Sequence, residues 1–244
     1  MKALLLSAGL GTRLKPFTDH HPKALAPVNG RSLLEWNIRN LQRFGIYDIV
    51  VNVHHFAQQI IDILEAENGF GSRIEISDES DAVLETGGGL VKAAHFLAQE
   101  PEFLVMNVDI LTNTDISKLI ARHKAHPCWA TLAIQQRKSS RYFIFDDQLV
   151  LKGWENVQTG EERIPSGKRI PSWSSYAFSG IHVISPVLLQ QIRQRGKFSL
   201  VDVYLDLCAS GQIRGWEHTG DLLIDVGKPE SLEKAGALFA DIPF

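Results

Sequence analysis

The sequence predicts an α/β fold, a Rossmann-like mixed and mostly parallel sheet with helices on both faces. Short apolar runs such as Lys2–Ser7 and Phe103–Asn107 are bounded by glycine or polar residues, as is typical of strands covered on both sides. Segments with helical spacing separate such runs four times along the first half of the chain. This alternation favours right-handed crossovers between parallel strands.

The first half of the chain carries clear helix and turn signals. Ser32 and Glu35 form a capping box, so we expect a helix to begin there and to end in a left-handed turn at Gly45. The three glycines at 87–89 lead into another helix. The remaining elements expected here are strands at 48–53, 73–77 and 103–107, helices at 56–65 and 91–97, and a helix that carries His123 and His126.

The pattern changes near residue 130. Strands at 130–136, 142–145 and 149–154 follow one another without long helices, which predicts a small antiparallel or mixed insertion, and the composition of residues 160–175 predicts a long loop. The closing elements are a strand at 174–184, helices at 187–193 and 200–209, strands at 213–217 and 222–225, and a helix at 229–239. We expect one domain spanning residues 1–244.

Composition excludes several classes of protein. The 244 residues carry 25 Lys and Arg against 28 Asp and Glu, a net charge of −3, and 44% are hydrophobic. This hydrophobic content and charge balance exclude a disordered, collagen-like or disulfide-rich protein. They also argue against nucleic-acid or anionic-membrane partners, which usually require an excess of Lys and Arg. No apolar run reaches the roughly 18 residues of a membrane span. Cys128 and Cys208 form no CxxC pair, so we expect a reducing compartment, the cytoplasm.

Ligands of open α/β sheets bind beyond the carboxyl ends of the strands. Three such segments stand out, namely Ser7–Arg13, Glu85–Gly89 and the single Asp109. Glycines let backbone amides approach a polyphosphate, and Lys15 and Lys23 add positive charge to that of the first segment. The third glycine of GxGxxG and the GK[ST] ending of a P-loop are both missing, so neither of those motifs is supported.

Two adjoining segments resemble the signature of sugar-1-phosphate nucleotidyltransferases, LAAGxGTRLxPxT…PKxLxPV. They are Leu6–Thr18, LSAGLGTRLKPFT, and Pro22–Val28, PKALAPV. Leu84–Gly89, LETGGG, resembles the nucleotide-recognition turn of that family, and Leu223–Gly227, LIDVG, resembles its W-x-D-V-G segment. The resemblance runs from Lys2 to about Leu238 and is weakest at 137–175. Ser7, Ala24, Ala26, Asn107 and Leu223–Ile224 depart from the pattern without removing a charged group.

Within the family, the ETGGG turn and Phe178–Ile181 are most similar to the uridylyltransferases of N-acetylmuramate 1-phosphate, which serve peptidoglycan recycling. The resemblance therefore implies UTP as the nucleotide and N-acetylmuramate 1-phosphate as the acceptor. That acceptor carries a carboxylate, so a cation such as Arg141 or Lys168 is expected beside it. Guanylyltransferases for mannose or heptose 1-phosphate, which more often show LGTAG or LGTGG, remain the alternative.

The resemblance also implies roles for individual residues. Arg13 and Lys23 would be catalytic, and Asp109 and Asp225 would hold Mg²⁺, a cation that suits oxygen ligands and phosphates. The sugar phosphate would meet Asn113, Arg141, Glu155, Ser179 and Gly180. The nucleotide would be bound by Ala8, Gly9, Gly11, Thr12, Arg13, Lys23, Glu85, Thr86, Gly87, Gly88 and Asp109.

The same reading divides the single domain into a nucleotide-binding half at 1–127, a sugar-phosphate-binding insertion at 128–184 and a closing segment at 185–244. A monomer or a small homo-oligomer is expected. Two further readings stay open. One is a glycosyltransferase of similar fold, although such enzymes usually have an Asp-x-Asp pair, which Asp109–Leu111 lacks. The other is an inactive nucleotide-sensing domain, although the presence of Arg13, Lys23, Asp109 and Asp225 together argues against loss of activity.

Overall fold

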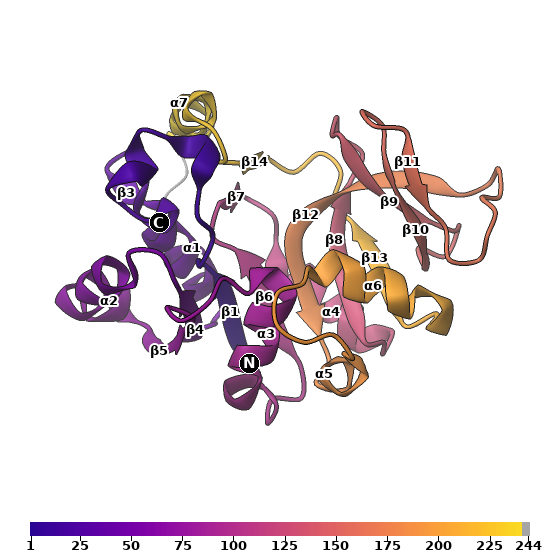
Figure 1. Ribbon diagram of the computed structural model, residues 1–244, viewed down its shortest axis with the longest axis horizontal. Coiled ribbons are helices and arrows are strands. Elements are labelled where there is room, and N and C mark those ends of the chain that lie inside the picture. Colours follow the sequence, from indigo (N-terminus) through magenta and orange to yellow (C-terminus); the bar gives the residue numbers. More distant parts are fainter. Residues whose placement is uncertain (241–244) are drawn as a thin grey trace.

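The computed structural model describes residues 1–240 and confirms the mixed, mostly parallel α/β sheet (Figure 1). Four parallel strands form its first half, in the spatial order β5, β4, β1 and β6. Their bounds are Arg73–Asp78 for β5, Asp48–Val53 for β4, Lys2–Leu6 for β1 and Phe103–Asn107 for β6. All four lie within a residue of the predicted ranges: β1, β4 and β6 are largely apolar runs buried on both faces, whereas β5 is a partly exposed edge strand in which apolar and polar residues alternate.

Strand β12 (Ser174–Ile184) joins the two halves of the molecule. Its C-terminal part pairs antiparallel with β6 on one side and with β8 on the other, and β13 lies parallel to β8. Its N-terminal part pairs with β9, followed by β10 and β11. The bounds are Ala130–Gln135 for β8, Arg141–Phe145 for β9, Leu151–Asn156 for β10, Glu161–Arg163 for β11 and Ile213–Glu217 for β13.

The insertion expected after residue 130 is present: β9, β10, β11 and the N-terminal part of β12 pair antiparallel, while β8, β13 and the rest of β12 extend the main sheet. One expectation about this region is corrected. The segment 160–175 is not wholly a loop, since it contains β11, which pairs with β10 through Glu155↔Glu162. This strand is charged and lies at an outer edge of the sheet, so it carries none of the apolar alternation that identifies a half-buried strand.

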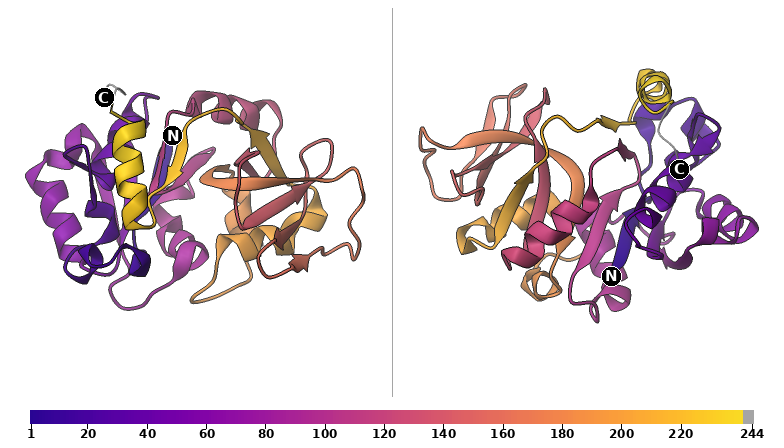
Figure 2. Two further views of the ribbon diagram at one scale, coloured as in Figure 1. Left: turned by 90° about the horizontal axis from the view of Figure 1, so that it is seen from above. Right: turned by 180° about the vertical axis from the view of Figure 1, so that it is seen from behind.

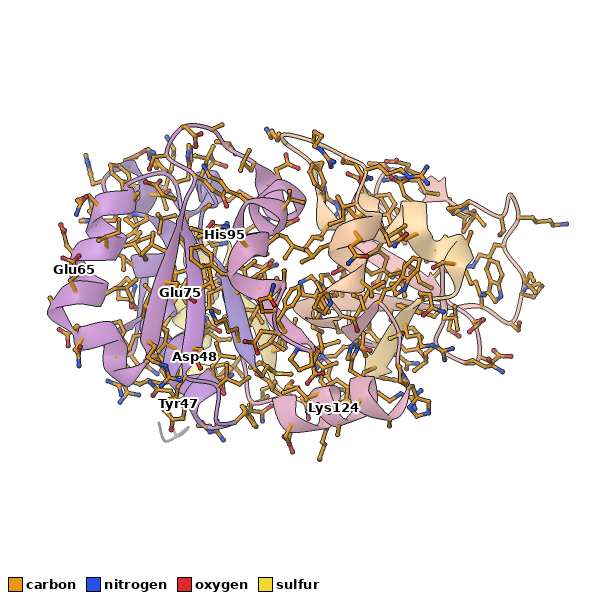
Figure 3. The ribbon with its side chains drawn as sticks, turned by 90° about the horizontal axis from the view of Figure 1, so that it is seen from below. Tyr47, Asp48, Glu65, Glu75, His95 and Lys124 are labelled. Atoms are coloured by element: carbon orange, nitrogen blue, oxygen red, sulfur yellow. The ribbon has the colours of Figure 1, made fainter. Side chains whose placement is uncertain are left out.

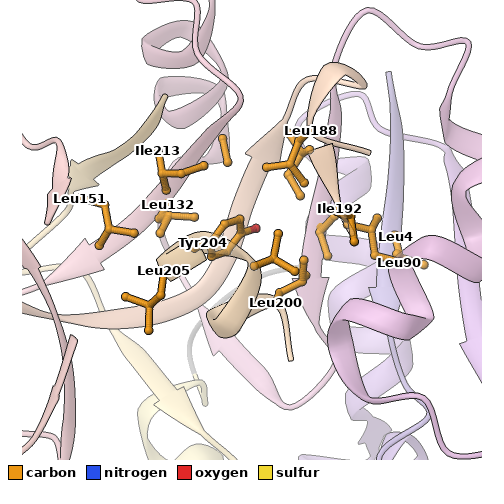
Figure 4. Packing of buried hydrophobic residues seen from close by; sticks show 14 of the residues in the cluster. Leu4, Leu90, Leu132, Leu151, Leu188, Ile192, Leu200, Tyr204, Leu205 and Ile213 are labelled. Atoms are coloured by element: carbon orange, nitrogen blue, oxygen red, sulfur yellow. The ribbon is translucent and has the colours of Figure 1, made fainter. Parts of the chain in front are cut away.

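Helices cover both faces of the sheet. Alternate residues of β1 point to opposite sides, so Leu4 and Leu6 pack with α3, α5 and α6 while Ala3 and Leu5 pack with α1, α2 and α4. Figure 4 shows the first of these clusters around the buried Tyr204. The helices are α1 (Leu33–Gln42), α2 (Ala57–Ala66), α3 (Glu85–Leu97), α4 (Ile116–Ala125), α5 (Val187–Gln191), α6 (Leu200–Leu207) and α7 (Pro229–Leu238).

Local signals placed the first helix correctly. The Ser32 hydroxyl accepts a hydrogen bond from the Glu35 amide at 3.1 Å, and Gly45 has the left-handed backbone, with φ of 74°, that ends the turn after α1. Exposed charges such as Glu65 on α2 and Lys124 on α4 lie at the outer surface (Figure 3). In residues 1–240 no helix has the length and apolar character needed to cross a bilayer.

The end of the chain returns to its beginning. After β13, strand β14 (Leu223–Asp225) pairs antiparallel with β7 (Ile110–Thr112), which follows β6. Helix α7 then packs beside the short hairpin of β2 (Pro27–Val28) and β3 (Arg31–Ser32) (Figure 2), and Phe239 contacts Trp36 edge to face. The last elements therefore belong to the same folded unit as the first strand.

Candidate active site

A cleft of about 490 Å³ opens where the parallel strands β1, β4 and β6 end. Such positions bind ligands in open α/β sheets because several loops converge there. The walls come from the loop after β1, the ends of β4 and β5, the start of α3, the segment after β6 and the approach to α6. The residues lining the cleft are Leu6–Arg13, Lys23, Asn52, Glu79, Val83–Thr86, Asn107–Asp109, Lys197, Ser199 and Gly227.

The loop after β1 is shaped by one glycine and one asparagine. Gly11 has φ of 63°, and a Cβ there would lie 2.8 Å from Thr18 and 2.9 Å from Lys23, so only glycine fits. The Asn52 Oδ1 atom accepts from the backbone amides of Ser7 at 2.5 Å and of Ala8 at 3.2 Å. The Asn52 hydrogen bonds and the close packing at Gly11 hold the backbone of the glycine-rich turn in one conformation.

Behind that loop, Asn52 is itself oriented by a buried acid. Two amides donate to its Oδ1, so its Nδ2 faces away and donates to Glu79 Oε1 at 2.7 Å. Glu79 is inaccessible to solvent, and its Oε2 has no hydrogen-bond partner within residues 1–240. Burial raises the pKa of Glu79, and the hydrogen bond from Asn52 opposes that shift in part. Asn52 is the penultimate residue of β4 and Glu79 directly follows β5, so both lie at strand ends where such sheets bind ligands, although neither was among the residues predicted from the sequence.

Three charged side chains meet at the other end of the cleft. Lys23 begins the short 3₁₀ turn Lys23–Leu25, is nearly buried, and forms an ion pair with Asp109 just after β6. Asp225 ends β14, and the adjacent Val226 amide donates to the Asp109 carbonyl at 2.8 Å. The pairing of β14 with β7 thus brings together two aspartates that lie far apart in the sequence.

Arg13 reaches the same cluster. A Cβ on Gly227 would lie 2.9 Å from Asp225 Oδ1 and 3.0 Å from Arg13 Nη2, so this glycine leaves room for both side chains to approach each other. Desolvation of the Asp225 carboxylate by the surrounding residues raises its pKa, and the nearby Asp109 carboxylate raises it further. Lys23 and Arg13 lower it. The site therefore concentrates two carboxylates and two cations.

Most nucleotide candidates line this cleft, but two do not. Gly87 and Gly88 lie inside α3, where a Cβ would collide with the Phe198 ring at 2.4 Å and with the Gly196 carbonyl oxygen at 2.3 Å. Their amides point to the Phe198 carbonyl, at 2.9 Å from Gly87 and 3.4 Å from Gly88. These glycines instead allow the loop before α6 to pack closely on α3.

The sugar-phosphate candidates are dispersed. Asn113 accepts from the Leu222 amide at 2.8 Å, Glu155 pairs with Arg169 at 3.1 Å, and Arg141 is exposed at the start of β9; all three lie outside the cleft wall. The structure thus does not bring these three to the cleft. Asn113 and Glu155 have other partners within the chain, and Arg141 is exposed to solvent.

Ser179 and Gly180 lie nearer, at the back of the cleft. The Ser179 hydroxyl is buried and bonds to His218 Nε2 at 2.8 Å. A Cβ on Gly180 would lie 2.9 Å from the Asn107 side chain, and Asn107 lines the cleft. Burial lowers the pKa of His218, so this imidazole is a neutral hydrogen-bonding partner for the strand.

The chain matches the nucleotidyl transferase family over residues 2–241. It belongs to that family. It is 31% identical to the N-acetylmuramate alpha-1-phosphate uridylyltransferase of Neisseria meningitidis serogroup B, with 98% of each chain covered. It is 28% identical to a mannose-1-phosphate guanyltransferase of Aspergillus fumigatus, covering 98% of this chain and 64% of the relative. The predicted family and enzyme class, a sugar-1-phosphate uridylyl- or guanylyltransferase, are confirmed.

Solved structures of nucleotidyltransferases share the fold. HddC from Yersinia pseudotuberculosis, solved with GMP-PN, has a TM-score of 0.77 at 21% identity, covering 98% of this chain and 99% of that one. The inositol-1-phosphate CTP transferase of T. maritima has a TM-score of 0.76 at 15% identity, covering 100% and 98%. The expected fold class is therefore confirmed over the whole length.

The acids of this nucleotidyltransferase fit a small hard cation. Within residues 1–240 no group of three or more His, Cys, Asp or Glu side chains is arranged to hold a metal ion. Asp109 lines the cleft, and Asp225 lies just outside its lining, close enough for the two carboxylates to interact. Mg²⁺ in phosphate-handling enzymes typically uses one or two carboxylates and completes its shell with water and phosphate oxygens.

Proposed function

We propose that this nucleotidyltransferase transfers a uridylyl group from UTP to N-acetylmuramate 1-phosphate. A phosphate oxygen of the sugar would form a bond to the α-phosphorus of UTP, the bond from that phosphorus to the β-phosphate bridging oxygen would break, and pyrophosphate would leave. The single observation that carries the proposal is the meeting of Lys23 with Asp109 and Asp225 beside the glycine-rich loop. The full-length similarity to a uridylyltransferase of this sugar supports the choice of substrates.

No general base is required for the proposed reaction. A phosphate monoester has a second pKa of about 6, so the attacking oxygen is already ionised near neutral pH. The chain's task is then to bring two polyanions together and to stabilise charge on the leaving group. Lys23, held by Asp109, is pre-oriented to meet the α-phosphate, and Arg13 with the Gly9–Thr12 amides would hold the β- and γ-phosphates.

Mg²⁺ is the proposed cofactor. Asp109 and Asp225 would hold it, and when bound it neutralises phosphate charge and aligns the reacting oxygens. The raised pKa of Asp225 fits this role, because an acid whose charged form is disfavoured gains most from a nearby cation.

We further propose that the reaction takes place in the cytoplasm, in the recycling of peptidoglycan sugars. Cys128 and Cys208 are free and buried, and a reducing compartment such as the cytoplasm keeps cysteines in the thiol form.

The base would lie at the other end of the cleft, against the Ser7–Ala8 backbone and the start of α3. Glu85 and Thr86 line that region, and Glu79 lies beneath it. Thr86 has a structural partner already, because its hydroxyl accepts from the Leu200 amide at 3.0 Å. We therefore assign the nucleobase contacts to backbone groups of Ser7–Ala8 and of the start of α3, with Asn52 and Glu79 holding the Ser7–Ala8 backbone in position.

Pyrophosphate release tests this proposal. Purified protein is incubated with Mg²⁺, each of UTP, GTP, CTP and dTTP, and each of several sugar 1-phosphates. Release is expected with UTP and N-acetylmuramate 1-phosphate and should stop when the metal is chelated. Faster release with GTP and mannose 1-phosphate would replace the proposal by a guanylyltransferase, and no release with any pair would reduce the protein to a nucleotide-binding role.

A further inference from the structure

Arg137 is a half-buried cation in the loop between β8 and β9 and was not among the site residues predicted from the sequence. Its Nη2 donates to the Phe178 carbonyl oxygen at 2.9 Å, on β12 just before Ser179 and Gly180. Its Nε is enclosed and has no acceptor within residues 1–240, and no carboxylate in that part of the chain lies within ion-pair distance. Enclosed guanidinium groups without an acid partner are uncommon in folded proteins.

The position of Arg137 relates it to the active site. Asp225 is the acid whose charge acts on it, and burial lowers the pKa of Arg137 while Asp225 raises it. Arg13 and Lys23 approach the two aspartates from the N-terminal half of the chain, whereas Arg137 approaches Asp225 from the side of β12. The second substrate of the proposed reaction must lie on that side, because the nucleotide loop occupies the other.

The two cations expected to meet the sugar's carboxylate lie elsewhere. Arg141 is exposed at the start of β9. Lys168 is exposed too and lines a separate hollow formed with Lys152 and Trp173, away from the aspartates. Arg137 also lies outside the cleft wall, but unlike these two cations it combines partial burial, an enclosed Nε without an acceptor and an electrostatic interaction with Asp225.

We infer that Arg137 binds the carboxylate of the acceptor sugar and so selects an acidic sugar 1-phosphate over a neutral one. The inference rests on the proposed function. N-acetylmuramate differs from N-acetylglucosamine by a lactyl ether that ends in a carboxylate. A guanidinium presents planar paired donors that match a carboxylate, and the contact is strong where water is excluded. The Phe178 carbonyl and the surrounding chain hold the group in place without neutralising it.

Steady-state kinetics with two acceptors test this assignment. Arg137→Gln should raise the KM for N-acetylmuramate 1-phosphate at least tenfold. The KM for N-acetylglucosamine 1-phosphate, or its inhibition constant as a competitor where turnover is slow, should change less than twofold. Arg137→Lys keeps the charge but loses the planar fork, so it should recover part of the loss.

Lys138→Gln is the matched control, because it removes a neighbouring exposed cation from the same loop and should alter neither constant. Equal effects of Arg137→Gln on both sugars would show that the side chain serves Asp225 or the phosphate, and would overturn the inference. So would unchanged constants in both Arg137 variants. A wild-type enzyme that accepts only neutral sugars would overturn the proposed acceptor and this inference together, whereas discrimination that survives in Arg137→Gln and Arg137→Lys overturns this inference alone. Should Arg137→Gln not fold, the Arg137→Lys comparison decides.

Discussion

At the scale of single residues, Lys23 is the side chain on which the proposed chemistry depends most. It is nearly buried and held by Asp109, so its ammonium group is already in place and needs little reorganisation. A group of this kind contributes more to the transition state, where charge builds up, than to the bound nucleotide.

Lys23→Ala is accordingly expected to lower kcat by about 10²–10³-fold, as is typical for loss of one preorganised donor. The KM for UTP should change by less than about fivefold. The exposed Lys124→Ala serves as control and should leave both constants unchanged, since Lys124 pairs with Glu102 on the outer surface. A raised KM with unchanged kcat in Lys23→Ala would assign this lysine to nucleotide binding only.

Glu79 gives the protein a specific pH dependence of stability. Its pKa is raised in the folded state, so the folded protein holds the proton more tightly than the unfolded chain does. The stabilising contribution is complete below the ordinary pKa of a glutamate and is lost as the pH rises through the raised value. Once ionised, this buried carboxylate with one unpaired oxygen weakens the fold.

Glu79→Gln cannot ionise, and its side-chain oxygen can still accept from Asn52. Its melting temperature relative to wild type should therefore increase between pH 5 and pH 8, by roughly 2–4 °C for about 1 kcal/mol. The exposed Glu65→Gln should show no such trend. Thermal unfolding across this pH range measures the difference, and parallel curves for Glu79→Gln and wild type would show that Glu79 does not titrate there.

At the scale of elements, the packing of α3 depends on Gly87 and Gly88, two glycines predicted from the sequence to bind the nucleotide. Gly88 faces the Gly196 backbone, which cannot move aside as a flexible side chain can, and Lys197 and Ser199 of the same segment line the cleft. The helix and the loop therefore meet only because no side chain stands between them. This close approach links the packing of α3 to the shape of the cleft.

Gly88→Ala should lower the stability by about 1–3 kcal/mol, the usual cost of overpacking, and should raise the KM for the nucleotide. Gly236→Ala in α7 is a suitable control, because its new Cβ would meet only the end of the Asn29 side chain. That variant should stay within about 1 kcal/mol of wild type. Denaturant unfolding gives the comparison, and equal stabilities of the two variants would contradict this account of α3.

The elements also show where sequence reasoning succeeds and where it stops. Buried parallel strands and the capping box at Ser32 are local signals, and they placed β1, β4, β6 and α1 correctly. The charged edge strand β11 leaves no such signal. Arg137 could not be predicted as a site residue from the sequence, because its hydrogen bond to the Phe178 carbonyl of β12 and its interaction with Asp225 exist only in the tertiary structure. Asn113, Arg141 and Glu155 lie outside the cleft wall, and their contact with the sugar phosphate stays a prediction.

At the scale of the whole molecule, stability should respond to ligands. UTP with Mg²⁺ at about 100 times the dissociation constant would add about 2.7 kcal/mol, which corresponds to a rise in melting temperature of roughly 5–10 °C. Chelation of the metal should remove most of this rise, and GTP should produce less of it. Asp109→Asn is the matched variant and should respond weakly to Mg²⁺; a full response in that variant would remove Asp109 from the metal site.

Strand β12 has a mechanical consequence. The same eleven residues pair with β6 of the nucleotide half at one end and with β9 of the second half at the other, and Gly180, with φ of 71°, lies near the change of partner. The halves are thus joined by a continuous hydrogen-bonded strand rather than by a flexible linker. Any closure of one half on the other has to bend or twist the sheet near Gly180, so the elasticity of that strand would set how far and how fast the cleft can close.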